Sequence, residues 1–516
     1  MKRINTGVAG LDMVLDGGLE PGAVVLVAGA PGTGKTILAQ QMCFAAATTE
    51  HKGVYYTTVS EPHTKLVRHL KPFTFFDAGS LGSRVEHIHL GDFLRPGRVG
   101  GLEPMVAEIV RKTLDDEPAV VVIDSAKMLS DFADPRELRG ALYDLSASFA
   151  ETEAVLLLVG EYTPQELGRG IEFSLADGII QLEYQIREPV DRRTLRVAKM
   201  RGGRHVPGRH TFQIGPAGIG VFPRIETLVP AIASPLSGPM RSGIPGLEKL
   251  MPNGMTRGDA TLVTGPSGVG KTTLGMGWIA RGLEEGERCL FVTFQDTPDH
   301  LMNMGATFGW NLAAAYASGQ LVISHVSMGD LELDVLADAV RQNLARHAVS
   351  RVAIDSLAEL VLADREWDRF PAFMRSLLGL VRAAGVSLLA TSETTGSGIT
   401  AQSLEGLMFL FDNVISLRYI EQQSALGRAL NVVKMRNSPH KMTLNSAAIT
   451  DKGLVVGDKL DGVSGRLGWS ALRVQDPPYR PGPAPSPSVI VPAPAKRALI
   501  SPRGVSLLLA CGYIPC

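Results

Sequence analysis

The sequence has few cysteines and lacks any long apolar run. Four cysteines occur among 516 residues, and no two of them form a CxxC pair. The first residues, MKRIN, are not followed by the apolar core of a signal peptide, so we expect a protein of the reducing cytoplasm. The longest apolar runs, near residues 154–160 and 386–390, are too short to cross a bilayer and predict buried strands. No membrane association is expected.

The chain also lacks an excess of charge of either sign. It carries 51 Lys and Arg against 52 Asp and Glu, a net charge of −1. This balance provides neither the basic field that attracts nucleic acid nor an acidic tail, so we do not expect a nucleic-acid partner. Length alone predicts about three domains, whereas an internal repeat favours two larger ones.

A glycine-rich stretch that is typical of phosphate binding occurs twice. Residues 29–36 read GAPGTGKT and residues 265–272 read GPSGVGKT. Each stretch follows an apolar, β-branched run and precedes a helix-compatible segment, which is the strand, loop and helix order that this motif requires. The alternative is a chance glycine-rich turn, but an eight-residue pattern in this context rarely arises twice by accident.

The residue types of these loops match the chemistry of a nucleotide polyphosphate. Glycines let the backbone curl tightly and aim its N–H groups at phosphate oxygens, and the following helix presents its positive end. We expect Lys35 and Lys271 to reach the β- and γ-phosphates, and Thr36 and Thr272 to ligate Mg²⁺, so the predicted cofactors are ATP and Mg²⁺. The nucleotide-binding residues predicted in the loops are Gly29, Pro31, Gly32, Thr33, Gly34, Lys35, Thr36, Gly265, Ser267, Gly268, Val269, Gly270, Lys271, Thr272 and Thr273.

Two further strands end in an aspartate, VVVID at Asp124 and VAID at Asp355. An apolar strand that ends in Asp is commonplace and often only caps a loop. Downstream of a phosphate loop, however, such a carboxylate holds Mg²⁺ through water or through the loop threonine. We therefore predict that Asp124 and Asp355 belong to the metal sites.

Three landmarks recur with nearly the same spacing, which indicates a duplicated domain. The two loop lysines are 236 residues apart, the two aspartates 231, and Lys199 and Lys434 235. Within each copy, short apolar strands alternate with helix-length segments, which predicts an α/β fold with a mainly parallel sheet. The predicted strands are residues 24–28, 54–59, 120–123, 155–159 and 178–182, and residues 260–264, 289–294, 351–354, 386–391 and 413–417.

Together these residues resemble the KaiC-like branch of the RecA-type ATPases, double-domain proteins related to the cyanobacterial clock ATPase. The resemblance covers residues 2–472 and includes the openings TGVAGLD and SGIPGLE, both phosphate loops, the Ile-Asp-Ser strand ends, and the segments KMRGGRH and KMRNSPH. It implies two tandem RecA-like P-loop NTPase domains, each a mainly parallel sheet flanked by helices. The predicted boundaries are residues 1–228 and 241–473 for the two ATPase domains, 229–240 for a linker, and 474–516 for a disordered tail rich in Pro, Ala and Ser.

The resemblance also implies a homo-oligomer, a hexameric ring with ATP at the subunit interfaces, and a regulatory protein partner. In such a ring, a Lys-x-Arg segment of one subunit reaches the nucleotide of its neighbour. Two cations at i and i+2 of a strand point to one face and suit a polyphosphate, although a solvated basic strand edge is the alternative. The residues implied to act in this way are Lys199, Arg201, His205, Lys434, Arg436 and His440.

The sequence departs from this family at the residues that activate water. Where the clock protein has two glutamates, the second copy has Gln295 and Asp296, and the first copy places Glu61 one position late. Glutamine orients a water but cannot take its proton, and the shorter aspartate reaches less far. We take Asp296, Gln295, Glu61, Lys35 and Lys271 as the candidate catalytic residues and expect slow turnover.

Two further comparisons bear on function. The family's phosphorylated Ser-Thr pair corresponds to Met408 and Phe409, which cannot accept a phosphoryl group, so autophosphorylation by the clock pattern is not expected. Glu161 and Glu393 end the strand after each aspartate strand and either sense the γ-phosphate or form an ordinary turn.

The leading interpretation is a ring ATPase that uses slow hydrolysis as a conformational or regulatory signal. The alternatives are a serine/threonine autokinase or protein kinase, a DNA-acting RecA-like ATPase, and a nucleotide-gated scaffold with negligible turnover.

Overall fold

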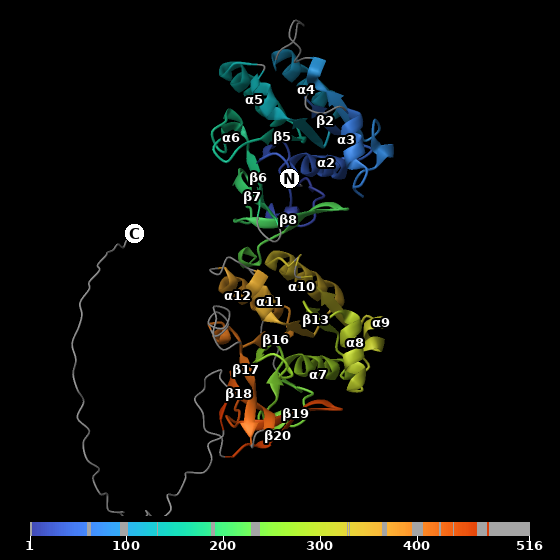
Figure 1. Cartoon of the computed structure of the whole chain (residues 1–516). Coiled ribbons are helices and arrows are strands. Elements are labelled where there is room, and N and C mark those ends of the chain that lie inside the picture. Colours follow the sequence, from blue (N-terminus) through green and yellow to red (C-terminus); the bar gives the residue numbers. More distant parts are fainter. Residues whose placement is uncertain are drawn as a thin grey trace, which may run out of the picture. The chain divides into compact units, whose positions relative to one another are not determined.

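A computed structural model describes most of the chain and contains two large sheets flanked by helices (Figure 1). Glu61, most of the expected linker and the whole of the expected tail lie outside the described residues. The described residues are 3–58, 63–92, 102–131, 133–186, 191–228, 238–327, 329, 331–363, 369–394, 406–422, 425–436, 438–461 and 472–473.

The first sheet has the strand order β3-β2-β4-β5-β1-β6-β7-β8-β9 within the described residues. The strands from β3 to β6 run parallel, and β6 to β9 are antiparallel. The strands are β1 (Val24–Gly29), β2 (Gly53–Thr57), β3 (Val85–His89), β4 (Val120–Asp124), β5 (Val155–Glu161), β6 (Gly178–Gln185), β7 (Arg192–Met200), β8 (His210–Gly215) and β9 (Gly218–Phe222).

The central strands are apolar throughout because both faces of the sheet are covered. All six residues of β1 are buried. Val25 and Val27 pack into one hydrophobic cluster, whereas Val24 and Leu26 pack into the cluster on the opposite face. This arrangement is typical of parallel sheets with helices on both sides. The helices of this half are α1 (Leu11–Val14), α2 (Lys35–Ala46), α3 (His63–Leu70), α4 (Leu102–Asp116), α5 (Pro135–Phe149) and α6 (Ile171–Leu175), with 3₁₀ helices η1 (Ala78–Ser80), η2 (Leu90–Asp92), η3 (Ala126–Asp131) and η4 (Ile225–Thr227).

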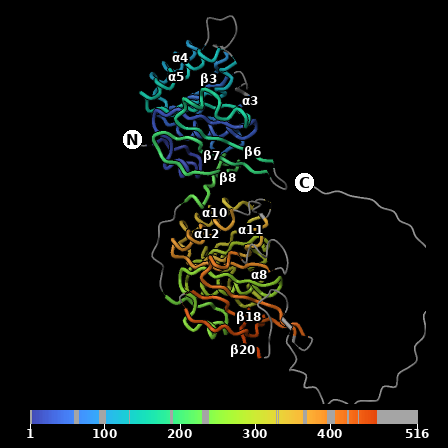
Figure 2. Tube along the Cα trace, turned by 90° about the vertical axis from the view of Figure 1, so that its left-hand side faces the viewer, coloured from blue at the N-terminus to red at the C-terminus, as the bar shows by residue number. Residues whose placement is uncertain are grey.

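The second sheet repeats this order as β14-β13-β15-β16-β12-β17-β18-β19-β20, and β21 also pairs with β17. Each sheet is built from one continuous half of the chain, and the colours of the trace in Figure 2 follow the two halves in turn. Two short strands, β10 (Pro239–Met240) and β11 (Met255–Thr256), pair with each other. The strands of the second sheet are β12 (Ala260–Gly265), β13 (Cys289–Thr293), β14 (Leu321–His325), β15 (Arg351–Asp355), β16 (Ser387–Glu393), β17 (Asn413–Gln422), β18 (Ala425–Met435), β19 (Asn445–Thr450), β20 (Gly453–Lys459) and β21 (Leu472–Arg473).

The predicted fold class is confirmed: two tandem domains, each with a mainly parallel sheet between helices. The sequence patterns located the central parallel strands. Apart from the strand assumed to carry each Lys-x-Arg segment, they did not locate the edge strands and the antiparallel extensions. Among the described helices, none is long and apolar enough to span a membrane. The helices of the second half are α7 (Lys271–Glu284), α8 (Pro298–Thr307), α9 (Leu312–Ala317), α10 (Leu333–His347), α11 (Leu357–Ala363) and α12 (Phe370–Ala383), with 3₁₀ helices η5 (Leu247–Lys249) and η6 (Met408–Leu410).

Candidate functional site

The first glycine-rich loop connects the carboxyl end of β1 to the start of α2. Gly32 and Gly34 adopt φ angles of 76° and 101°, which side chains with a Cβ rarely occupy. A Cβ at Gly29 would lie only 2.4 Å from the carbonyl oxygen of Leu182 on the neighbouring strand. The glycines are thus required by the backbone itself, which turns sharply before the helix begins at Lys35.

The second loop has the same construction between β12 and α7. Gly268 and Gly270 have φ angles of 73° and 108°. A Cβ at Gly265 would approach the Leu417 carbonyl oxygen to 2.6 Å. The two loops therefore share their backbone conformation as well as their sequence.

Both loop lysines fold back onto their own loops, Lys35 buried and Lys271 half-buried. Lys35 Nζ donates a hydrogen bond to the Ala30 carbonyl at 2.8 Å and lies 3.6 Å from a Glu161 carboxylate oxygen. Lys271 Nζ donates in the same way to the Pro266 carbonyl at 2.9 Å. Burial lowers the pKa of both lysines, and nearby carboxylates, first Glu161 and Glu393 respectively, oppose this shift.

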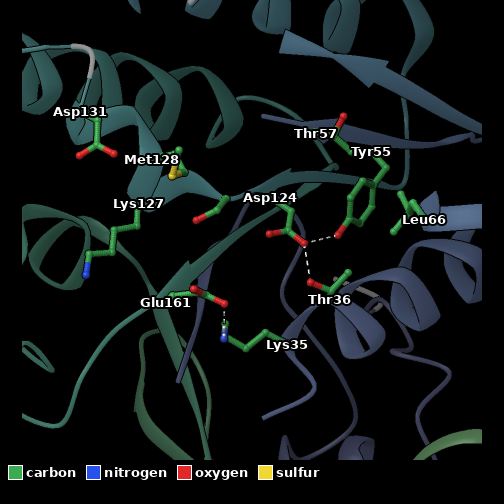
Figure 3. Close-up of a pocket in the computed structure, with 11 residues that line it drawn as sticks. Lys35, Thr36, Tyr55, Thr57, Leu66, Asp124, Lys127, Met128, Asp131 and Glu161 are labelled. Atoms are coloured by element: carbon green, nitrogen blue, oxygen red, sulfur yellow. Dashed lines mark hydrogen bonds and ion pairs between the residues drawn. The ribbon is translucent and has the colours of Figure 1, made fainter. Parts of the chain in front are cut away.

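The structure brings the first-loop threonine and Asp124 together. Thr36 Oγ1 donates to Asp124 Oδ2 at 2.8 Å, and the buried Tyr55 hydroxyl donates to the same oxygen at 2.6 Å (Figure 3). Burial raises the pKa of Asp124, while these two hydrogen bonds and the Lys35 charge act in the opposite direction. Hydroxyl and carboxylate oxygens converging in this way form the hard-ligand set that Mg²⁺ prefers.

Asp355 is held in the second site by a different set of donors. Thr272 Oγ1 donates to Asp355 Oδ2 at 2.7 Å, as the repeat predicts. The other carboxylate oxygen accepts from Thr391 on β16. Burial again raises the pKa of the aspartate, and the two threonine hydroxyls lower it. The repeat thus preserves the loop threonine and the aspartate but changes the partner that fixes the carboxylate.

The first loop opens onto a cavity of about 460 Å³. Lys35, Thr36, Asp124 and Glu161 line it (Figure 3). Sequence reasoning did not single out several other side chains of this wall. Of these, Lys127 could have been predicted from the sequence. It lies three residues after Asp124, in the segment that follows the carboxyl end of β4. The additional lining residues are Tyr55, Thr57, Leu66, Ser125, Lys127, Met128 and Asp131.

The candidate water-activating residues of the second site follow β13. Asp296 Oδ1 lies 2.7 Å from Nδ1 of His300, in the first turn of α8. The Gln295 amide nitrogen donates to Glu359 on α11, which the sequence analysis did not single out. Glu61, the candidate of the first site, lies outside the described residues.

The Lys-x-Arg segments lie at the far end of each sheet from the phosphate loop. Lys199 on β7 pairs with Ile179 near the start of β6, and the neighbouring Gly178 pairs with Val25 at the start of β1. The phosphate loop instead follows the carboxyl end of β1. Here Lys199 Nζ donates to the Ser174 carbonyl at 3.1 Å, and Arg201 lies 3.5 Å from Asp177. His205 follows the same strand end.

The second half repeats this separation. Lys434 on β18 pairs with Val414 at the start of β17, away from the loop that follows β12. Lys434 Nζ donates to the Phe411 carbonyl at 2.5 Å, and Arg436 lies 3.5 Å from Asp412. The Nε2 atom of His440 is buried and has no hydrogen-bond partner among the described residues.

Comparison with known proteins gives the same family across both halves. A family model described as the KaiC ATPase matches residues 4–226 and again residues 240–461. The circadian clock oscillator protein KaiC of Parathermosynechococcus lividus is 26% identical over 481 residues, 91% of this chain and 88% of that protein. The circadian clock protein KaiC3 of Synechocystis sp. is 26% identical over 491 residues, 92% of this chain and 95% of that protein.

Proposed function

Because the chain belongs to the KaiC family of ATPases, we propose that it is a Mg²⁺-ATP-binding ring ATPase whose slow hydrolysis serves as a conformational or regulatory signal. One observation carries the proposal: each half joins a phosphate loop to a threonine and aspartate in hydrogen-bond contact. In this proposal Thr36 with Asp124, and Thr272 with Asp355, hold Mg²⁺. When bound, the ion neutralises charge that develops on the phosphate oxygens.

The proposed reaction is hydrolysis of the terminal phosphate. A water oxygen bonds to the γ-phosphorus while the bond from that phosphorus to the bridging oxygen breaks, so the products are ADP and inorganic phosphate. Lys35 and Lys271 bind and orient the phosphates, and the water proton leaves with the phosphate product. Gln295 orients the water in the second site without taking its proton, and Asp296 is already engaged by His300, which supports slow turnover.

The ring is proposed from the position of the cationic segments. Since Lys199 and Lys434 lie at the end of the sheet opposite the phosphate loop of their own half, they cannot reach that nucleotide, and we propose that they contact the nucleotide of a neighbouring subunit. Family resemblance suggests six subunits. Arg201, His205, Arg436 and His440 are proposed to act beside these lysines at the subunit interface.

A nucleotide-gated scaffold with negligible turnover is the second candidate. It is favoured by the pairing of Asp296 with His300, which occupies the one carboxylate of the second-site pair. A kinase of the clock type is less well supported because Met408 and Phe409 stand where hydroxyl side chains are needed.

Incubation with ATP that is labelled at the γ-phosphate distinguishes the ATPase from the scaffold. We expect slow release of labelled phosphate, reduced by more than tenfold when Lys35→Ala and Lys271→Ala are combined, since each lysine contacts the transferred group. Each single variant then reports the share of its own site. Label that stays in bound ATP would support the scaffold, and label retained on the protein would make the chain a kinase.

A further inference from the structure

A buried carboxylate, Glu359, faces the second nucleotide site from the first turn of α11. It lies four residues after Asp355, and only 7% of its surface is exposed. Its negative charge is close enough to Lys271 to oppose the lowering of that lysine's pKa. Burying a carboxylate costs free energy unless its oxygens accept hydrogen bonds. The hydrogen-bond partners of Glu359 therefore indicate its role in the site.

Both carboxylate oxygens of Glu359 accept hydrogen bonds. Oε2 accepts from the hydroxyl of Ser356, which anchors the side chain to the end of β15. Oε1 accepts from the amide nitrogen of Gln295. The carboxylate therefore links the loop after β13 to the start of α11, across the carboxyl ends of two adjacent strands.

This contact decides which way the Gln295 amide faces. An amide has a donating NH₂ group and an accepting oxygen, whereas an ionised carboxylate only accepts. Only the NH₂ group of Gln295 can therefore face Glu359, and the amide oxygen is directed away from it. An amide oxygen accepts a hydrogen bond from water and so turns a water lone pair toward its target, whereas an NH₂ group would turn it away.

The first site has no equivalent carboxylate at this position. Met128 stands four residues after Asp124 and lines the first cavity. A thioether is at most a weak acceptor and cannot select one orientation of an amide. The carboxylate at this position is therefore specific to the second site, in which the family's glutamate pair is replaced by Gln295 and Asp296.

We propose that Glu359 is a positioning residue of the second site, which holds the Gln295 amide so that its oxygen orients the attacking water. This inference rests on the proposed ATPase function. Glu359 acts through Gln295 and does not itself accept the water proton. The second site then uses a carboxylate, an amide and a water where a direct glutamate base would otherwise stand.

The test uses the full chain carrying Lys35→Ala, so that phosphate release reports the second site. We expect Glu359→Ala to lower kcat on the order of tenfold and to change KM for ATP less than about twofold, since orientation rather than binding is lost. Glu359→Gln should recover most of kcat, because its own amide oxygen still accepts from Gln295. The exposed Leu362→Ala on the same helix is the matched control and should match the parent.

A double-variant cycle distinguishes positioning from a purely structural role. In a Gln295→Ala background, Glu359→Ala should cause no further loss of kcat, because the group that it positions is gone. An equal loss in both backgrounds would overturn the inference, as would a Glu359→Gln variant as slow as Glu359→Ala, which would make Glu359 a base.

The same experiment keeps this inference separate from the proposed function. An active chain in which Glu359→Ala behaves like Leu362→Ala would overturn the positioning role alone. An unsubstituted chain that releases no phosphate above the Lys35→Ala and Lys271→Ala double variant would overturn the ATPase function and the positioning role with it. A Lys35→Ala chain that releases none, beside an active unsubstituted chain, would overturn the positioning role alone. Binding of a fluorescent ATP analogue to each variant checks that the loop is folded.

Discussion

The two aspartates of the proposed magnesium sites, Asp124 and Asp355, have similar neighbours in sequence but different neighbours in space. Asp124 accepts from Tyr55 on the adjacent strand β2, whereas Asp355 accepts from Thr391 on β16 at its other side. A phenol and a small hydroxyl fix the carboxylate from opposite directions. The loop threonine is common to both sites, so the difference lies in the support of the carboxylate.

The raised pKa of Asp124 leads to a prediction about stability. The protonated carboxyl is favoured in the folded state, so its stabilising contribution is present at pH values below about 4, the ordinary range of an Asp, and is lost as pH rises through the folded-state pKa. We therefore expect Asp124→Asn to be more stable than the parent at pH 7, with a difference that shrinks as pH falls towards 4. Chemical unfolding between pH 4 and pH 8 measures this.

The exposed Asp451→Asn provides the control for that experiment and should leave the pH dependence unchanged. An Asp124→Asn chain that is less stable than the parent at every pH would contradict the prediction. It would mean that the hydrogen bonds from Thr36 and Tyr55 outweigh the cost of burying the charge.

At the scale of the element, each site depends on a strand that ends in a glycine turn and passes directly into a helix. In β1, α2 and the loop between them, the strand residues are buried, the loop glycines have positive φ, and the helix starts at the lysine. The helix N-terminus and the loop N–H groups therefore point to one place, which favours an anion there. The repeat reproduces the whole unit in β12 and α7.

Alanine substitutions at Gly32 and Gly286 separate the effect of backbone strain on stability from the effect on ATP binding. Gly32 and Gly286 have φ angles of 76° and 77°, and a Cβ at either would meet no described heavy atom within 4 Å. We expect Gly32→Ala and Gly286→Ala each to reduce the free energy of unfolding by about 1 kcal/mol, because both force a side chain into the left-handed region.

Only Gly32→Ala should also weaken ATP binding, by about tenfold or more, since its Cβ would stand where the phosphates approach the backbone. Unfolding curves together with titration of a fluorescent ATP analogue, in a chain carrying Lys271→Ala, test both parts. Equal binding by the two variants would show that the first loop does not hold the nucleotide.

At the scale of the whole molecule, the sheet order keeps the Lys-x-Arg segment away from its own loop. In the first half, β6 lies beside the loop-bearing strand β1 and parallel to it, and β7 lies beside β6 and runs antiparallel. In the second half, β17 and β18 have the same arrangement beside β12. The cations at the end of the antiparallel strand therefore lie beside the amino-terminal ends of the parallel strands, whereas the phosphate loop follows a carboxyl end. We therefore expect that any role of these cations in nucleotide binding depends on assembly with another subunit.

Mixing two inactive variants tests this in a Lys271→Ala background, which isolates the first site. Chains carrying Lys35→Ala lack the loop lysine, and chains carrying Lys199→Ala with Arg201→Ala lack the cations. We expect each to be inactive alone and a dissociated, reassembled equal mixture to recover roughly a quarter of the parent first-site activity, since random assembly joins an intact loop to intact cations at that fraction of interfaces.

Reassembly of each variant with itself is the control. A mixture whose activity equals the mean of the two separate preparations would show that both groups act within one subunit or that no ring forms. Phosphate release, normalised to the parent taken through the same procedure, is the measurement.

The sequence by itself determined the duplicated α/β architecture, the two phosphate loops and the aspartates paired with them. These features depend on local requirements: glycines with positive φ, apolar strands buried on both faces, and a lysine and threonine at a helix start. Such requirements leave direct marks in a linear pattern. The role of Glu61 remains a prediction from the sequence, since that residue lies outside the described part of the chain.

Only the tertiary structure decided which side chains complete each site. Tyr55, Thr391 and Glu359 contact their partners across strands and helices that are far apart in the chain, and no sequence spacing specifies those contacts. The apolar pattern did not locate the edge and antiparallel strands, because half of their residues are exposed; only the strand with each Lys-x-Arg segment was expected, from its charges. Strand order and register set these neighbours, and both result from packing of the whole sheet.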